Sequence, residues 1–146
     1  MRNRPSLILA ALTATLAASA TPGLAADNST LTVNFTGLQP KGVVNFMVVD
    51  SRDSYDGKAP AKVVDRVVVT GSSASVTLKD LAPGRYALKA FHDLNGDGKM
   101  NTNPFGIPLE PFSFSNNARG RMGPTSWEAA SFEMIEGSNA QTLAFD

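Results

Sequence analysis

Short runs of alternating apolar and polar residues, separated by turn-forming residues, limit most strongly how this chain can fold. Residues 30–36 read TLTVNFT, and residues 74–79 read ASVTLK, so that every second residue is apolar. A period of two indicates a half-buried β-strand, whereas an amphipathic helix has a period near 3.6. No segment after residue 29 keeps a helical period. The sequence therefore predicts an all-β protein.

The number of strands and turns suggests the type of β fold. Tyr86 opens a strand directly after the Pro83-Gly84 turn, as at a tyrosine corner, where the hydroxyl bonds back to the preceding connection. We predict a seven-stranded Greek-key β-sandwich, immunoglobulin-like or transthyretin-like, with one long ordered loop before the last two strands. The expected strands lie within residues 30–36, 43–49, 62–70, 74–79, 80–93, 129–136 and 140–145.

The first residues have the layout of a secretory signal peptide. Two arginines precede the apolar run of residues 6–18, and small residues follow it. The run is shorter than the roughly 20 residues that cross a bilayer. We therefore expect cleavage after Ala25 or Ala26, which gives a leader at residues 1–25 and a single domain at residues 26–146.

Composition excludes several classes of site and partner. The chain has 13 basic and 13 acidic residues without a basic stripe, so nucleic acid is not an expected partner. Cysteine is absent, which excludes disulfides, thiolate metal sites and cysteine nucleophiles. An arginine-bearing leader on a chain without cysteine fits export in a bacterium, to the periplasm or the medium. No transmembrane segment is expected once the leader is removed.

DLNGDG, residues 93–98, matches the opening of the calcium-loop pattern D-x-[DN]-x-[DN]-G. Calcium takes about six to eight oxygen ligands, which alternate positions of a tight loop can supply. The twelfth position is Pro104 instead of the usual glutamate, so we expect weak binding of Ca²⁺ in a structural role, with Glu110 completing the shell if the chain folds back. The candidate metal ligands are Asp93, Asn95, Asp97, the carbonyl of Lys99, and Asn101.

A different interpretation of the same residues needs no metal. Asp, Asn and Gly are also the preferred turn residues, because their side chains cap nearby amides and they tolerate left-handed backbone. The segment would then be a turn held by Asx hydrogen bonds alone. The sequence leaves both interpretations open.

Aromatic residues gather in the segment before the last two predicted strands. Exposed together, they would form an apolar or sugar-stacking surface for a small apolar ligand, a glycan or an unknown envelope protein. Packed together, they would form a satellite core under a long loop. The candidate ligand-binding residues are Phe105, Phe112, Phe114, Trp127, Asn116 and Asn117.

His92 is the only histidine and the only candidate for acid–base catalysis of the usual kind. A small hydrolase-like enzyme could use His92 with Asp93 and Glu110. A structural role is favoured instead, in which the ring nitrogens of His92 hydrogen-bond the long loop. The chain has no Gly-x-Ser-x-Gly elbow, His-Glu-x-x-His motif or phosphate loop. We therefore predict a protein that is more a binding or structural envelope module than an enzyme.

The segment from residue 84 to residue 132 resembles a bacterial family of exported proteins catalogued as domain of unknown function 2141. The motifs that carry the resemblance are Pro-Gly-x-Tyr, His-Asp-x-Asn-x-Asp-Gly, Asn-x-Phe-Gly-x-Pro-x-Glu and Phe-Ser-Asn-Asn. Asn101 stands where the family more often has aspartate. The resemblance implies an exported β-sandwich and no particular activity. The residues concerned are Pro83, Gly84, Tyr86, His92, Asp93, Asn95, Asp97, Gly98, Asn103, Phe105, Gly106, Pro108, Glu110, Phe114, Ser115, Asn116 and Asn117.

Overall fold

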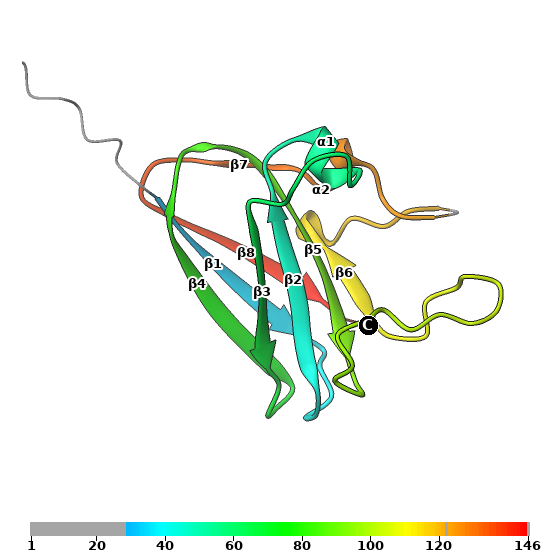
Figure 1. Cartoon of the computed structure of the whole chain (residues 1–146). Helices are drawn as coiled ribbons and strands as arrows, with labels where there is room; N and C mark the ends of the chain where they lie inside the picture. Colours follow the sequence, from blue (N-terminus) through cyan, green and yellow to red (C-terminus); the bar gives the residue numbers. More distant parts are fainter. Residues whose placement is uncertain (1–28, 122, 146) are drawn as a thin grey trace, which may run out of the picture.

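This computed structural model describes residues 29–121 and 123–145, in which two β-sheets pack face to face (Figure 1). The predicted leader, residues 1–25, lies outside the described residues. Within them, no helix has the length and apolar character needed to cross a membrane. The prediction of a protein built mainly of β-strands in two sheets is confirmed.

The smaller sheet has the strand order β4-β1-β8. β1 (Ser29–Thr36) lies antiparallel to β4 (Ser73–Leu81) and parallel to β8 (Ser138–Ala144). Buried and half-buried residues alternate along the whole of β1. Its odd-numbered residues therefore face the second sheet, as the period of two predicts.

The larger sheet has the strand order β3-β2-β5-β6 and carries the candidate site. β3 (Val63–Val68), β2 (Val43–Val49), β5 (Gly84–Asp93) and β6 (Phe112–Phe114) all run antiparallel to their neighbours. β7 (Phe132–Met134) pairs with the start of β5. β5 thus pairs with three strands and organises this sheet.

The segment after β5 differs from the prediction. The described residues form eight strands instead of seven, because β6 has three residues and is too short to show a period of two. The strand expected at residues 129–136 begins instead with helix α2 (Trp127–Ala130), where the Oγ of Ser126 accepts a hydrogen bond from the amide of Ala129. The single long loop expected before the last two strands also contains β6 and the 3-10 turn η1 (Ser115–Asn117). The immunoglobulin-like or transthyretin-like Greek-key assignment stays a prediction.

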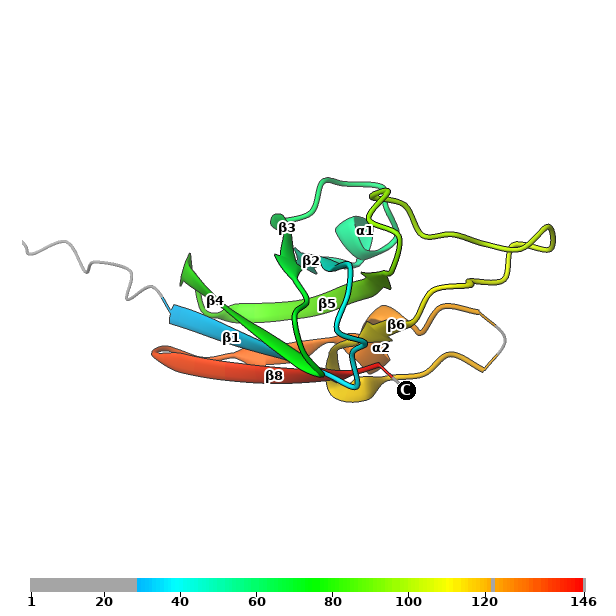
Figure 2. The same ribbon diagram turned by 90° about the horizontal axis from the view of Figure 1, so that it is seen from below.

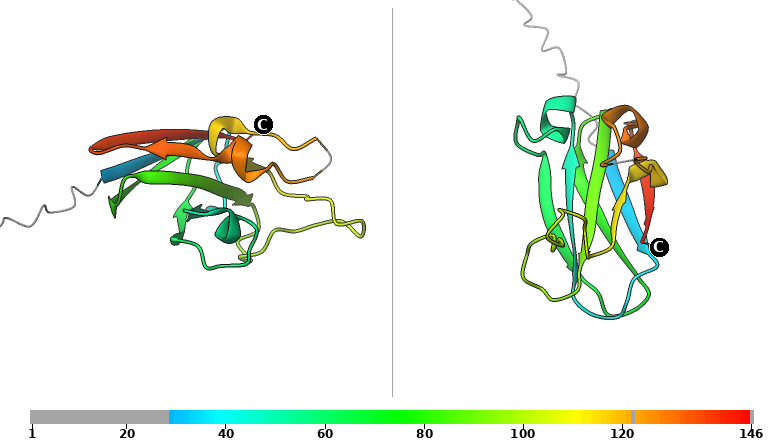
Figure 3. Two further views of the ribbon diagram at one scale, coloured as in Figure 1. Left: turned by 90° about the horizontal axis from the view of Figure 1, so that it is seen from above. Right: turned by 90° about the vertical axis from the view of Figure 1, so that its right-hand side faces the viewer.

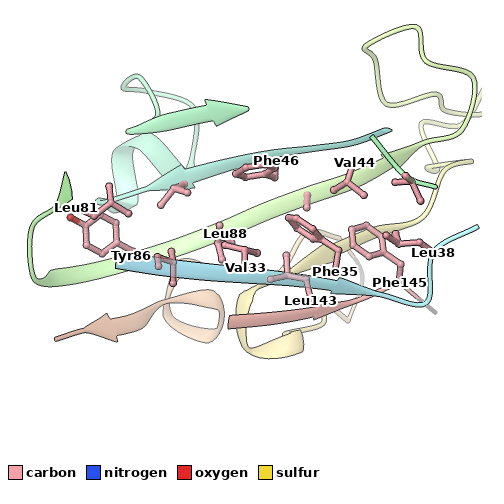
Figure 4. Packing of buried hydrophobic residues seen from close by; sticks show 14 of the residues in the cluster. Val33, Phe35, Leu38, Val44, Phe46, Leu81, Tyr86, Leu88, Leu143 and Phe145 are labelled. Atoms are coloured by element: carbon pink, nitrogen blue, oxygen red, sulfur yellow. The ribbon is translucent and has the colours of Figure 1, made fainter. Parts of the chain in front are cut away.

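The main core lies between the two sheets (Figure 4). The ring centroid of Phe35 lies 5.5 Å from that of Phe46 and 6.3 Å from that of Phe145. Toward the opposite end of this core, the hydroxyl of Tyr86 donates to the carbonyl of Ala82 at 2.8 Å. This bond is the one predicted from the tyrosine corner.

A second core lies on the outer face of the larger sheet. This satellite cluster consists of Val49, Tyr55, Ala87, Phe114, Trp127 and Ala130. Helices α1 (Arg52–Tyr55) and α2 lie at this end of the sheet (Figures 1 and 3). The ring of Tyr55 lies 5.9 Å from that of Trp127, and its hydroxyl donates to the carbonyl of Thr125 at 2.8 Å. The satellite cluster thus covers one end of the outer face.

The buried phenol of Tyr55 should make the free energy of unfolding depend on pH in the alkaline range. Burial, and to a smaller extent the charge of Asp56, raises the pKa of Tyr55 from 10.0 to about 12. Because the folded pKa is the higher one, the stabilisation from the neutral phenol is complete below pH 10.0 and is lost as the pH rises through about 12. At pH 7, Tyr55→Phe should lower the free energy of unfolding by about 1–3 kcal/mol, since the Thr125 carbonyl loses its donor.

Urea unfolding of both proteins across the alkaline range checks this expectation. The difference in free energy of unfolding between wild type and Tyr55→Phe should be constant below pH 10.0 and should shrink above it. A difference that stayed constant up to about pH 12 would contradict a phenol kept neutral by burial.

Candidate functional site

The long connection, residues 94–111, begins at a fully buried carboxylate. Oδ1 of Asp93 accepts hydrogen bonds from the amides of Gly96 at 2.7 Å and Asp97 at 3.2 Å. Oδ2 accepts from the amide of Gly98 at 2.8 Å and from Nδ2 of Asn45 at 3.1 Å. Four donors fill the roughly four lone-pair positions of a carboxylate. Asp93 therefore fixes the first turn of the connection and ties it to β2.

A second buried carboxylate closes the base of the same connection. Oε1 of Glu110 accepts from the amide of Leu94 at 2.8 Å, and Oε2 accepts from the amide of Asn101 at 3.0 Å. The chain therefore folds back on itself, as the prediction for Glu110 requires. In this structure the carboxylate binds backbone amides, so Glu110 clamps the two ends of the loop together.

Exposed side chains complete the turn. Oδ1 of Asp97 accepts from the amide of Lys99 at 2.9 Å, and Oδ2 accepts from Nδ2 of Asn101 and Nδ2 of Asn95, each at 3.2 Å. These bonds, that of Lys99 first, hold the pKa of Asp97 below its usual value. Their contribution to stability is therefore present at neutral pH and is lost as the pH falls through the pKa of the folded state.

The predicted calcium ligands lie close together, but their hydrogen bonds are those of a self-bonded Asx turn. Both Asp93 oxygens are filled by donors, and the amide nitrogens of Asn95 and Asn101 point at Asp97. The described residues contain no group of three or more His, Cys, Asp or Glu side chains able to hold a metal ion. An ion in the turn would require both asparagine amides to rotate and Asp93 to release donors. Calcium binding therefore stays a prediction, and this arrangement does not fit a preformed site.

His92 lies on the inner face of β5 and is only 1% exposed. Its Nε2 bonds the carbonyl of Lys41 at 2.8 Å, and its ring lies 6.3 Å from that of Phe145. The ring therefore holds the β1–β2 connection, and the prediction that it bonds the long loop is wrong for the side chain. Only the backbone amide of His92 reaches that connection, at the carbonyl of Pro111.

The same alternation separates the proposed catalytic groups. Asp93 follows His92 in the strand, so the two side chains point to opposite faces of the sheet. In the described part of the chain, no hydrogen bond joins the His92 ring to Asp93 or Glu110; the imidazole bonds the carbonyl of Lys41 instead. The imidazole is thus buried and bonded to the β1–β2 connection.

The predicted aromatic surface is divided in two. Phe114 and Trp127 are buried in the satellite cluster, whereas Phe105 is 88% exposed and Phe112 is 48% exposed. The two asparagines make structural bonds: Nδ2 of Asn116 donates to the carbonyls of Ala129 and Ser131, and Oδ1 of Asn117 accepts from the amide of Ala144. The satellite core therefore forms from Phe114 and Trp127, whereas a ligand-binding role of the exposed Phe105 and Phe112 stays a prediction.

An apolar groove of about 880 Å³ lies on the open end of the outer face of the larger sheet. Its floor is formed by outward-facing residues of β2 and β5, and the long connection forms a wall. Figures 2 and 3 show the long connection and the segment before α2 projecting from the same end of the sandwich. The main lining residues are Met47, Lys89 and Phe91 on the floor, Met100 and Ile107 on the long connection, and Phe112 on β6.

Sequence reasoning missed the floor of this groove. The signal is present in β2, VVNFMVV, and β5, GRYALKAFHD, where apolar residues occupy both faces. Met47 and Phe91 belong to the outward-facing sets, which a sheet with a purely solvated outer face would fill with polar residues. An apolar outer face indicates that something covers it, and here α1 and α2 cover only one end.

We expect Glu110→Gln to loosen the long connection without unfolding the sandwich. Glutamine keeps one acceptor but presents an NH₂ group to the other amide, so the amide of Leu94 or Asn101 loses its partner. The expected loss is about 1–3 kcal/mol in the free energy of unfolding. Hydrogen exchange followed by NMR should show a larger loss of protection at these two amides than at Leu88 in β5, whose protection should fall by no more than the change in the global free energy of unfolding.

Asp97→Asn is the matched control for this experiment. Its side chain is exposed and bonds only within the turn, so the free energy of unfolding should change by less than about 1 kcal/mol. Unchanged exchange at both Leu94 and Asn101 in Glu110→Gln would show that the carboxylate does not hold the connection.

Comparison with known proteins gives the family of the chain. A family model described as an uncharacterised protein conserved in bacteria, domain of unknown function 2141, matches residues 27–142. No curated protein and no solved structure matches the chain. The matched range includes both buried carboxylates and the lining of the groove. The chain therefore belongs to the bacterial family of domain of unknown function 2141, the family that its motifs resemble.

Proposed function

We propose that this protein is an exported, non-enzymatic binding module that holds a small apolar ligand in the groove. The groove itself carries the proposal: its volume of about 880 Å³ lies within the range of about 300–1,000 Å³ usual for small-molecule sites. Export rests on the predicted leader. The buried His92, bonded to Lys41, gives no support to the alternative of a hydrolase-like enzyme.

Hydrogen bonds hold the walls of the groove in one position, although several of its apolar side chains are exposed to solvent. Ile107 and Phe112 are 57% and 48% exposed. Two buried carboxylates fix the connection that carries Ile107, and pairing with β5 fixes Phe112. Apolar residues held exposed around a concave surface are typical of a binding site, because burial against a ligand recovers the hydrophobic free energy.

The lining favours a small apolar ligand over a glycan. Its polar side chains are few: Asn45, Asp65 and Lys89. The amide of Asn45 already donates to Asp93. A glycan would require several free polar groups beside its stacking ring. An envelope protein as partner is an alternative that the exposed Phe105 at the loop tip would serve, but Phe105 does not line the groove.

Binding of the neutral fluorophore N-phenyl-1-naphthylamine tests the proposed site. We expect saturable binding with enhanced fluorescence, weakened about tenfold in Phe112→Ser, because the substitution removes apolar contact from the lining. Phe105→Ser is the matched control and should bind as wild type does, since Phe105 lies outside the groove. Equal losses in both variants would place the bound dye on the loop tip, and no saturable binding to wild type would overturn the proposal.

Calcium dependence tests what holds the wall of the groove. Because the carboxylates already bind amides, we expect calcium up to about 10 mM to leave Tm unchanged. A site with Kd near 10⁻³ M, as in weak extracellular modules, would instead add about 1.4 kcal/mol at that concentration and raise Tm by a few degrees. A saturable rise that is lost in Asp97→Ala, and that magnesium does not produce, would establish the ion and revise the role assigned to the turn.

A further inference from the structure

We infer that the ligand is an amphiphile with one carboxylate head and one apolar chain, and that Lys89 binds the head. This inference rests on the proposed function of the groove and names the chemistry of its ligand. Lys89 lines the groove and contacts Tyr55 of the satellite cluster, so it lies where the open end of the outer face meets the covered end.

The ammonium group of Lys89 is half-buried and held in place. Nζ donates to the carbonyl of Tyr55 at 2.9 Å and lies 4.7 Å from the centroid of the Tyr55 ring. Both contacts are with uncharged groups. The ion pairs between described residues join Arg52 to Glu128, Lys58 to Asp56 and Lys62 to Asp50, and none of them includes Lys89.

Among the described residues, no ion pair reaches the ammonium of Lys89, a residue that lines the groove. The charge of Asp56 acts on Lys89 from beyond ion-pair distance, but that carboxylate pairs with Lys58. An ammonium group has three N–H donors, and the Tyr55 carbonyl uses one. A single carboxylate on the ligand would supply a second acceptor and a negative charge in direct contact with the ammonium. A bond of this kind gains strength in an apolar site, because water competes less for both ions.

The second charged residue of the lining, Asp65, is exposed, whereas Lys89 is half-buried. Asp65 lies on β3, is exposed, and accepts a hydrogen bond from the amide of Arg66 at 2.8 Å. The floor is thus cationic and the rim anionic, an arrangement that favours an anionic head bound inside over a cationic one. Met47 pairs with Lys89 on the floor, and Phe91, Ile107 and Phe112 line the same groove, so apolar side chains are available to an apolar chain beside the head.

Displacement of N-phenyl-1-naphthylamine by dodecanoate, dodecanol, dodecyl phosphate and dodecyltrimethylammonium, each below its critical micelle concentration, tests the inference. With wild type we expect dodecanoate to bind about tenfold more tightly than dodecanol and to be the tightest of the four. Shortening the chain by one methylene should weaken binding about fourfold. In Lys89→Met the ratio of the affinities for dodecanoate and dodecanol, both measured on that variant, should fall to about one, and Lys89→Arg should retain the wild-type ratio.

Lys79→Met, at an exposed lysine of β4 on the other sheet, is the matched control and should keep the wild-type preference. Equal binding of dodecanoate and dodecanol to wild type would overturn the inference, but it would still support a groove that binds a small apolar ligand. Tighter binding of dodecyl phosphate would overturn the carboxylate assignment. Failure of both the dye and dodecanoate to bind wild type would overturn the inference and the proposed function together. A Lys89→Met protein that keeps the preference for dodecanoate would also overturn the role of Lys89.

Discussion

The outer face of this sandwich depends on two buried carboxylates that bind backbone amides. Asp93 ends β5 and collects four donors, and Glu110 returns to clamp the amides of Leu94 and Asn101. A buried carboxylate without donors would be strongly destabilising, so each carboxylate requires the turn that satisfies it. The loop also requires the carboxylates, because its backbone amides donate to them. This mutual requirement holds a long connection in one shape without cysteine and without a packed core of its own.

The two faces of the larger sheet consequently have different roles. Its inner face packs against the smaller sheet and contributes to the main core, as with Phe46 against Phe35. Its outer face is also apolar but is covered only where α1 and α2 lie over it. Lys89 stands at the boundary, because its ammonium lies over the ring of Tyr55 in the satellite cluster and the residue also lines the groove. Under the proposed function, binding belongs to the open end of the outer face, whereas the main core lies on the inner face of the same strands.

Local pattern was sufficient to predict most of the fold and part of the site. The alternation in residues 30–36 identified β1, and Tyr86 after a Pro-Gly turn identified the bond that closes its corner, because both signals lie within a few residues of one another. Two features could not be read in this way. β6 has three residues and derives its strand conformation from pairing with β5. The clamp by Glu110 joins residues 16 apart through a chain reversal that no periodicity encodes.

The DLNGDG motif shows why a metal pattern and a turn pattern are hard to distinguish from sequence. Both need acceptor oxygens at alternate positions of a tight turn, and both need glycine where the backbone is left-handed, as at Gly96 and Gly98. The deciding property is where the oxygens point. At Asp93 they receive amides of its own turn and of Asn45, a residue 48 positions earlier in the chain. That partner is set by the pairing of β2 with β5, so the fold of the sheet determines the chemistry of the loop.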